Sequence, residues 1–449
     1  MSHQHTSRRN FIKGAAGIAA FTIVPSHVLG GPKHIAPSEK LNIACIGCGG
    51  KGASDIRAIS NQNIVALCDV DSKRAARTFK DHPKAKKYTD FREMLEKEDK
   101  NIDAVMISTP DHTHAVAAMA ALKMGKHVYC QKPLAHNIHE VRALTEEAAK
   151  QNLVTQMGIQ IHAYDRMKLG VEMIKSGLIG KVHHVDVWSS KSQRGGTSAP
   201  LPTKPLPSMP IPNTLEWDLW LGPAPEREYN IGYHPSKWRR WRDFGVGRLG
   251  DMGCHIIDPA FWALDLVSPI AVEAHCSEFN DQVYHYSNIV QWDFAARGDQ
   301  PAVTMKWYDG VNHPPVPKGM PKDFKLPNQG GLYYGDKGIL LLPHMTGSSP
   351  KSVGPVLLPL SKMKGFEAPE QLYERGIDHY QEWVRACKGE GKALTPFDYS
   401  GPLTETVLLG NVAARVGEKL QWDAKKMSIT NLPEANAFLS RQYRKGWSL

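Results

Sequence analysis

The chain has 449 residues, which is too long for one compact hydrophobic core, so at least two domains are expected. Hydrophobic residues make up 41% of it and charged residues 22%, a composition that excludes an intrinsically disordered protein. The formal net charge is +10, but the positive residues are scattered, so we expect no nucleic-acid binding and only a mildly basic surface for anionic ligands.

The N-terminus carries the features of an export signal. Residues 7–13, with the pair Arg8 and Arg9, fit the twin-arginine pattern, and a short, weakly hydrophobic stretch follows over residues 14–24. That stretch is too short to cross a bilayer, so stable membrane insertion is not expected. An accidental arginine pair before a core helix is the alternative. We predict a signal and linker over residues 1–38, and a periplasmic protein that is exported in folded form.

The seven cysteines lack the even count and regular spacing of a disulfide framework. Several lie in apolar, strand-like runs, where a free thiol behaves as a small hydrophobic side chain. A zinc site built from Cys48, Cys130 and Cys254 with nearby histidines is the alternative. No C-x-x-C pair supports that site, and we expect no bound metal.

Short apolar runs alternate with helical stretches between residues 40 and 158. The expected strands cover residues 40–46, 64–68, 103–108, 127–130 and 154–158, and the expected helices cover residues 53–60, 73–79, 91–97, 115–124 and 139–151. Such alternation predicts βαβ units and a parallel sheet, and continuous apolar strands fit a sheet covered on both faces. An α/β domain over residues 39–162 is therefore expected.

Residues 163–449 predict a second domain of α+β type. Its expected helices cover residues 165–176, 378–388 and 403–420, and its expected strands cover residues 182–189, 271–275, 288–294, 302–307 and 338–342. An irregular insertion over residues 192–243 is rich in proline up to Pro212 and then carries four tryptophans, whose density argues against disorder. A second proline-rich loop is expected over residues 309–330.

A glycine-rich loop, Gly47-Cys48-Gly49-Gly50-Lys51-Gly52, joins the first strand to the first helix. Gly47 allows the tight turn, Gly49 lets the backbone approach a pyrophosphate, and Gly52 allows close packing of helix on strand. Asp69 ends the second strand, where it can hydrogen-bond the adenosine ribose and disfavour a 2′-phosphate. This context predicts dinucleotide binding, with a purely structural glycine turn as the alternative. Lys73 and Arg74 keep NADP open beside NAD.

Two further motifs end strands of the same sheet. Thr109-Pro110, with His114, follows the third strand, and Gln131-Lys132-Pro133 follows the fourth. Both fall at the carboxyl edge, where open α/β sheets bind their ligands. A lysine near a cofactor can hold a substrate hydroxyl and assist its deprotonation when its pKa is lowered. Read alone, Lys132 is equally a surface lysine.

Asp251 and His255 are spaced to share one face of a helix expected from Gly250 to Leu264. A carboxylate and an imidazole converging near the start of that helix suit the binding of a hydroxyl and the removal of its proton. A capping aspartate and a core histidine are the alternative.

Together these motifs resemble the Gfo/Idh/MocA family of NAD(P)-dependent sugar and polyol oxidoreductases. The resemblance is specific from about Leu41 to about Leu266 and includes the segment Gly158 to Gly180 with Tyr164. It implies that Lys132, Asp251 and His255 are the catalytic set. It also implies a second domain with a large, open, mostly antiparallel sheet, whose face serves in a homo-oligomer, a dimer or a tetramer. One departure is Gln131, where the family usually has glutamate near the nicotinamide ribose.

The resemblance also implies an activity: NAD(P)-dependent oxidation at a secondary hydroxyl of a sugar, glycoside or polyol. The cofactor is expected to be NAD, with NADP not excluded. The expected cofactor-binding residues are Gly47, Cys48, Gly49, Gly50, Lys51, Gly52, Asp69, Thr109, Pro110, His114, Gln131 and Lys132. Two alternatives remain open, namely glycoside cleavage by transient oxidation and elimination, and a non-catalytic sugar sensor. The tryptophan-rich insertion is expected at the mouth of the site, either stacking on sugar rings or serving as a structural lid or dimer arm.

Overall fold

The computed structural model describes residues 39–190, 201–344 and 354–449. Leu41–Leu449 form one compact unit. The predicted twin-arginine motif at residues 7–13 and the first residues of the insertion lie outside the described residues. Among the described helices, none is long and apolar enough to cross a membrane.

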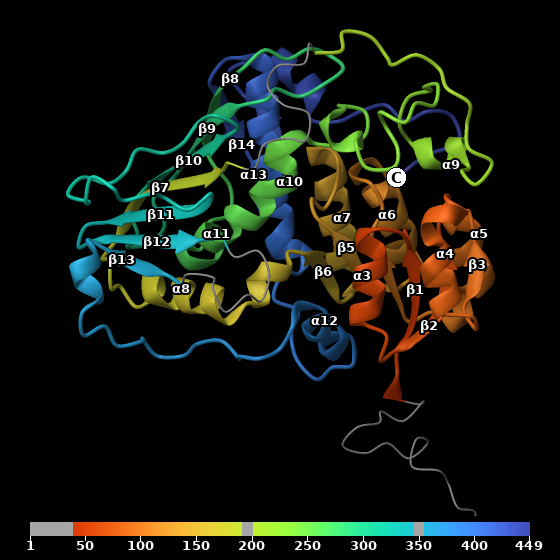
Figure 1. Cartoon of the computed structure of the whole chain (residues 1–449), viewed down its shortest axis with the longest axis horizontal. Helices are drawn as coiled ribbons and strands as arrows, with labels where there is room; N and C mark the ends of the chain where they lie inside the picture. The colour runs from red at the N-terminus through yellow and green to blue at the C-terminus, as the bar shows by residue number, and fades with distance from the viewer. Residues whose placement is uncertain (1–38, 191–200, 345–353) are drawn as a thin grey trace, which may run out of the picture. The chain divides into compact units, whose positions relative to one another are not determined.

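The first half of this unit is a doubly wound domain around a six-stranded sheet (Figure 1). All its strand pairs are parallel, and the strand order is β3-β2-β1-β4-β5-β6. The strands are β1 (Asn42–Ile46), β2 (Asn63–Cys68), β3 (Lys86–Tyr88), β4 (Ala104–Ile107), β5 (His127–Gln131) and β6 (Thr155–Gly158). The helices are α3 (Lys51–Ala58), α4 (Ser72–Asp81), α5 (Phe91–Glu98), α6 (His114–Lys123) and α7 (Ile138–Gln151). The predicted parallel α/β fold is confirmed.

Burial explains why the strands of this sheet are continuous apolar runs. Along β1, Ile43 and Cys45 belong to one hydrophobic cluster, whereas Ala44 and Ile46 belong to another. Successive side chains of a strand point to opposite faces, so helices cover both faces and each face needs its own apolar core. The strand β3 escaped prediction because Lys86 and Lys87 give it no apolar run.

The second half is built on a nine-stranded sheet of order β13-β12-β11-β7-β10-β9-β8-β14-β15. Only the pair β7 and β10 is parallel among its described strands, so the sheet is mixed and mostly antiparallel, as predicted. The strands are β7 (Val182–Ser189), β8 (Ala271–Cys276), β9 (Asn288–Phe294), β10 (Val303–Asp309), β11 (Gln329–Gly335), β12 (Ile339–Pro343), β13 (Val356–Leu358), β14 (Leu420–Asp423) and β15 (Ser428–Ile429).

Helices of the second half cover one face of this sheet (Figure 1). They are α8 (Asp165–Lys175), α10 (Gly247–Ile256), α11 (Asp258–Leu264) and α13 (Phe397–Val416). Helix α9 (Trp217–Leu221) belongs to the cluster of the insertion, and α12 (His379–Cys387) packs on the first half of the unit. Short 3-10 turns are η2 (Asp99–Asn101), η3 (Asp111–Thr113), η4 (Gln160–Ala163), η5 (Trp238–Arg240), η6 (Leu360–Met363) and η7 (Pro433–Phe438). The single helix expected from Gly250 to Leu264 is wrong. Two helices, α10 and α11, replace it, and Pro259 stands in the first turn of the second, where its missing N–H costs nothing.

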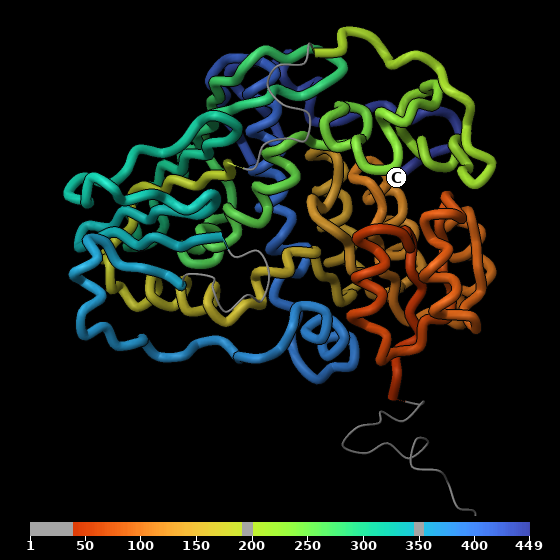
Figure 2. Tube along the Cα trace, viewed as in Figure 1, coloured from red at the N-terminus to blue at the C-terminus, as the bar shows by residue number. Residues whose placement is uncertain are grey.

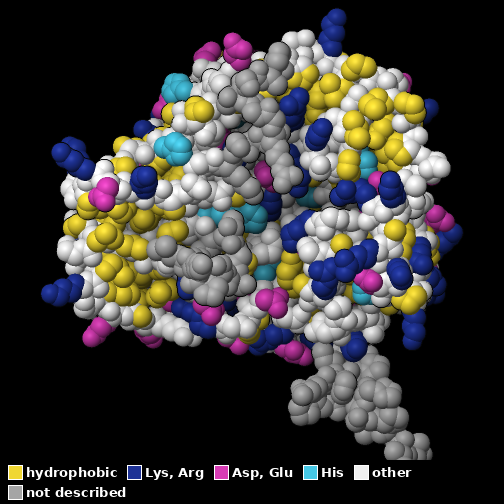
Figure 3. All heavy atoms as spheres, viewed as in Figure 1, with side chains coloured by type: hydrophobic (Ala, Val, Ile, Leu, Met, Phe, Trp, Pro, Cys, Tyr) yellow, Lys and Arg dark blue, Asp and Glu magenta, His cyan; other side chains and the backbone are white. Residues whose placement is uncertain are grey.

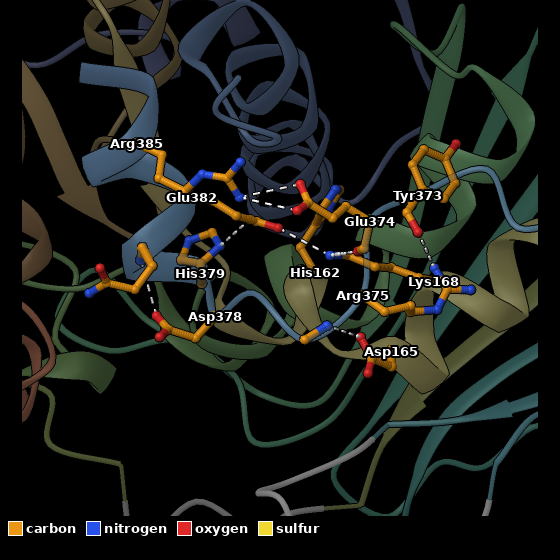
Figure 4. A network of polar contacts seen from close by, with 12 residues as sticks. His162, Asp165, Lys168, Tyr373, Glu374, Arg375, Asp378, His379, Glu382 and Arg385 are labelled. Atoms are coloured by element: carbon orange, nitrogen blue, oxygen red, sulfur yellow. Dashed lines mark hydrogen bonds and ion pairs between the residues drawn. The ribbon is translucent and has the colours of Figure 1, made fainter. Parts of the chain in front are cut away.

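Hydrogen bonds between charged side chains connect α12 and α13 to the rest of the unit. The guanidinium of Arg142 on α7 donates to both carboxylate oxygens of Glu405 on α13, each at 2.8 Å. Figure 4 shows Lys168 on α8 pointing toward Glu382 on α12, with the Lys168 Nζ 3.1 Å from the carboxylate. The contact between Arg142 and Glu405 joins the two predicted domains, and a boundary at residue 162 stays a prediction.

Candidate active site

The glycine loop has the geometry that a dinucleotide requires. Gly47 has a φ of 84°, and a Cβ there would lie 2.7 Å from the Ser108 carbonyl oxygen. A Cβ on Gly52 would lie 1.9 Å from the Gly47 carbonyl oxygen, so the start of α3 tolerates no side chain at that position. The loop therefore brings backbone N–H groups and the N-terminus of α3 to the carboxyl edge of the sheet, where they suit a pyrophosphate.

Asp69 braces this loop. Its carboxylate accepts backbone N–H groups from Cys48 at 2.7 Å, Gly49 at 3.1 Å and Asp71 at 2.9 Å. Burial raises the pKa of Asp69, and these three donors oppose the shift. Arg74 lies against the same loop, since a Cβ on Gly50 would be 2.8 Å from its guanidinium. Contact of Asp69 with a ribose stays a prediction.

The structure brings Lys132 and Asp251 together from positions 119 residues apart. Lys132 ends β5, and its Nζ donates to the Asp251 carboxylate on α10 at 2.8 Å. Arg239, at the end of η5, donates from Nε to the same carboxylate oxygen at 3.1 Å. Burial alone would raise the pKa of Asp251, but the charges of Lys132 and Arg239 hold it well below its usual value. Asp251 is therefore an anion that joins two cations.

His255 completes the predicted set one helical turn after Asp251. Burial, reinforced by the positive charge of Lys132, lowers the pKa of His255 well below its usual value. The imidazole is therefore neutral near pH 7 and is able to accept a proton. The ring of His344, which follows β12, lies 6.0 Å from the His255 ring between centroids.

The predicted cofactor residues Thr109, Pro110 and His114 follow β4 at the carboxyl edge of the sheet, close to the segment after β5. His114 has its two ring nitrogens 2.8 Å from the Pro133 carbonyl oxygen and 2.9 Å from that of Thr109. It thus ties the segment after β4, with Thr109 and Pro110, to the segment after β5. Direct contact of these residues with a cofactor stays a prediction.

Gln131 has a buried acid as its partner. Its Nε2 donates to Asp55 on α3 at 2.9 Å, and the Asp55 carboxylate also accepts from Ser108 at 2.7 Å and from Tyr380 at 2.6 Å. Lys51 of the glycine loop forms an ion pair with the same group. A carboxylate from α3 therefore adjoins the position where the family usually carries one on β5.

Sequence reasoning missed Arg239, Asp111, His344 and Asp55. Asp111 lies inside a motif that was singled out, and burial raises its pKa to about 7, against the opposing charges of Arg239 and Lys132. Arg239 lies in a short basic and aromatic run, which the sequence offers only as a weak surface signal. For His344 and Asp55 no local pattern exists, because their neighbours come from distant parts of the chain.

The tryptophans of the insertion form a core of their own. Trp217, Trp220, Trp238 and Trp241 are all buried in one cluster, and the rings of Trp217 and Trp220 stack at 4.7 Å. This favours the predicted structural role, as a lid or a dimer arm, over rings that stack on sugars. Figure 2 shows the C-terminal end of the chain lying beside this insertion, where Arg444 donates to the carboxylates of Asp218 and Glu226.

All seven cysteines are free thiols. Among the described residues, no group of three or more His, Cys, Asp or Glu side chains is placed to hold a metal ion. Figure 3 shows histidine, lysine and arginine side chains gathered in the middle of the view, between the strands of the second sheet and the helices of the first.

Fold and site together define a nicotinamide-dinucleotide-binding protein of Rossmann type with a second domain on a large open sheet. Two family models match the chain. One, an oxidoreductase family with an NAD-binding Rossmann fold, matches residues 41–159, and the other, the C-terminal alpha/beta domain of that oxidoreductase family, matches residues 171–298. The chain belongs to the Gfo/Idh/MocA oxidoreductase family, and its Rossmann domain binds NAD.

Curated relatives are similar over part of the chain. A myo-inositol 2-dehydrogenase of Thermotoga maritima is 30% identical over 152 residues, 33% of this chain and 45% of the relative. A glycosyl hydrolase family 109 protein of Solibacter usitatus is 32% identical over 200 residues, 40% of this chain and 44% of the relative. The matches thus span less than half the length of these relatives.

Solved structures share the whole fold. The WlbA dehydrogenase from Bordetella pertussis, in complex with NADH and UDP-GlcNAcA, has a TM-score of 0.59 at 14% identity and covers 86% of this chain and 99% of its own. An aldose-aldose oxidoreductase from Caulobacter crescentus, complexed with glycerol, has a TM-score of 0.58 at 15% identity and covers 85% and 100%. At such identities the likeness shows the fold alone.

Proposed function

We propose that this chain is an NAD-dependent oxidoreductase that oxidises a secondary hydroxyl of a sugar, glycoside or polyol. The observation that carries the proposal is the ion pair of Lys132 with Asp251, next to a neutral, partly buried His255 at the carboxyl edge of an NAD-binding sheet. The inositol dehydrogenase among the relatives supports a polyhydroxylated substrate.

Each residue of the set has a role that its environment supports. His255 accepts the proton of the substrate hydroxyl because its imidazole is neutral. Lys132 donates a hydrogen bond to the hydroxyl oxygen and stabilises the negative charge that develops on it. Asp251 fixes the Lys132 ammonium group and orients the substrate. Bound NAD accepts the hydride.

Substitution of the set tests this proposal. Lys132→Met and His255→Ala should each lower turnover of the best sugar by about 10²- to 10⁴-fold, because each removes a group that acts on the proton in transit. Both variants should still bind NAD, measured by fluorescence titration. Near-normal turnover in both variants would overturn the proposed roles.

A second candidate is glycoside cleavage through transient oxidation and elimination, with the hydride returned at the end. The glycosyl hydrolase family 109 relative favours keeping it. Release of a free reducing sugar from a glycoside, with no net change in NADH absorbance, would decide for this activity. Net NADH formation in proportion to the sugar consumed would decide for the dehydrogenase.

We also propose export by the twin-arginine route to the periplasm, and a homo-oligomer, dimer or tetramer. Residues 7–13 support the first proposal. Replacing Arg8 and Arg9 together by lysine should retain the protein in the cytoplasm on cell fractionation. Sedimentation of the purified protein measures the second, and a monomer would contradict it.

A further inference from the structure

Four polar residues form a row across neighbouring strands of the second sheet. Asn288 on β9 pairs with Asp309 on β10, Asp309 pairs with Ser189 on β7, and Ser189 pairs with Gln329 on β11. Residues directly opposite one another in a sheet point to the same face. All four side chains are buried, on the face that the helices cover. The row is thus a polar strip at the end of an otherwise apolar inner face.

Several atoms in and beside this row have no partner among the described residues. They are both amide atoms of Asn288, the Asp309 Oδ1, the Arg248 Nε and the His255 Nδ1. Elsewhere in the row, the Gln329 amide donates to Ser189 Oγ at 2.8 Å, and the Trp307 indole donates to Asp309 Oδ2 at 2.9 Å. Buried polar groups are nearly always hydrogen-bonded, and each one left unsatisfied costs about 1 to 3 kcal/mol. Such a concentration of unsatisfied atoms needs an explanation.

The row lies next to the catalytic helix. Helix α10 packs on β7 and β11, and it carries Arg248 one turn before Asp251. The backbone N–H of His344 donates to the Gln329 carbonyl at 2.9 Å, while its ring lies 6.0 Å from that of His255. One end of the strip therefore borders the predicted proton acceptor.

Arg248 and Asp309 carry opposite charges but do not pair. No described acidic side chain lies within ion-pairing distance of Arg248, although the side chain is buried. Burial lowers the pKa of Arg248 and raises that of Asp309 to about 7, while each charge opposes the shift of the other. A buried cation and a buried acid that do not pair directly are both stabilised by a polar ligand that hydrogen-bonds to them.

We propose that Arg248, Asn288 and Asp309 form a substrate subsite that binds neighbouring hydroxyl groups of a neutral carbohydrate ring. Each hydroxyl both donates and accepts a hydrogen bond, the asparagine amide offers one of each, the carboxylate accepts and the guanidinium donates. Because one cation and one acid offset each other, the subsite selects a neutral ligand rather than a sugar acid. This subsite rests on the proposed carbohydrate oxidation and fixes the ring on the side of His255.

The first test needs no ligand. Groups kept for a substrate are unsatisfied in its absence, so Asn288→Leu and Arg248→Met should melt at or above the wild-type temperature, with a gain of about 2 °C or more. Gln291→Leu is the matched control, because Gln291 lies on the same strand with its side chain on the opposite face. Melting of both row variants several degrees below wild type would overturn the subsite, since the groups would then be structural.

The second test measures binding of D-glucose, methyl β-D-glucoside and myo-inositol to the NAD-loaded protein by calorimetry. A sugar that binds the wild type should bind Asn288→Leu and Asp309→Asn about tenfold more weakly, with NAD affinity and the Gln291→Leu control unchanged. Equal affinity in the row variants would overturn the subsite. Binding of none of the three to the wild type would count against the proposed function, and the melting temperatures would then decide alone on the row.

Discussion

The acids around the candidate site differ in what surrounds them, and that difference assigns their roles. Asp251 forms ion pairs with Lys132 and Arg239, so it is ionised and holds both cations in place. The Asp55 carboxylate accepts from four donors in four segments of the chain, so its role is to connect these segments. Asp111 is buried near two cations and forms no ion pair with the described residues, and its pKa of about 7 leaves it partly protonated at neutral pH.

Because Asp55 contacts Gln131, we expect two substitutions that are each harmful to compensate each other in a double-mutant cycle. Gln131→Glu should weaken NAD binding about tenfold or more and lower the melting temperature, because it sets a second carboxylate against a buried one. Asp55→Asn should also be harmful, since it removes an acceptor. The double variant should recover most of both losses, because an amide and a carboxylate are again paired. Additive losses would show that the two groups are not coupled.

Asp111 predicts a dependence of stability on pH. Its pKa in the folded chain, about 7, is higher than its ordinary value of 3.8, so the folded state binds more protons between these limits. This contribution to stability is complete below about pH 4 and is lost as the pH rises to about 7. Asp111→Asn does not lose this stability. The difference in the free energy of unfolding between Asp111→Asn and wild type should therefore be roughly 2 to 4 kcal/mol larger at pH 8 than at pH 4. Urea unfolding at both pH values measures it, and a constant difference would refute it.

At the scale of elements, the insertion contacts the turn that follows β2, where we propose that the adenosine half of NAD binds. The Glu216 N–H donates to the Val70 carbonyl at 2.9 Å, and the Ser72 N–H donates to Thr214 at 2.9 Å. His234 places its Nε2 2.8 Å from the Asp71 carboxylate, which also caps α4. The insertion thus contacts the turn that follows Asp69 through three hydrogen bonds, and a core of tryptophans lies behind these contacts.

This attachment predicts slower exchange of the cofactor. His234→Ala removes one buried contact, so NAD should dissociate about five- to tenfold faster in stopped-flow displacement, while the rate of the chemical step changes little. His275→Ala on β8, an exposed position, is the control. An unchanged dissociation rate would mean that the insertion does not restrain the cofactor edge.

At the scale of the whole molecule, Leu41–Leu449 behave as one compact unit. The Phe397 N–H donates to Thr155 at 2.9 Å, the Met157 N–H donates to Thr395 at 2.8 Å, and Arg142 pairs with Glu405. C-terminal helices therefore complete the packing of the Rossmann sheet. The two halves of the chain share an interior rather than meeting at a thin interface.

A shared interior predicts a single unfolding transition. Saturating NAD should shift the whole transition upward, by about 2.7 kcal/mol at a hundred times its Kd, because it binds only the folded state. Calorimetry of the purified chain with and without NAD measures this. Two separate transitions, with NAD raising the temperature of only one of them, would show that the two halves unfold independently.

The sequence alone determined the local features. Strand-forming apolar runs and glycines that only a tight turn accepts are encoded within a few neighbours, so the parallel sheet and the NAD loop were predictable. The set of Lys132, Asp251 and His255 came from the family resemblance, and its catalytic role stays a prediction. The failures have a common physical cause. Local patterns were weak at each of these elements. Strand β3 is exposed, and β11 contains Gly330 and Gly331 near its start. Helices α10 and α11 are separated just before Pro259.

Tertiary structure decided everything that depends on distant neighbours. Chain packing decides whether Asp55 meets Gln131 and whether Arg239 reaches Asp251. It also decides that the Asn288 amide and one Asp309 oxygen lack a partner. No short pattern records them, because hydrogen bonds and charge interactions act over a few ångströms in space, regardless of separation along the chain. The sequence therefore determined what kind of cofactor the protein binds, and only the fold decided which side chains surround it.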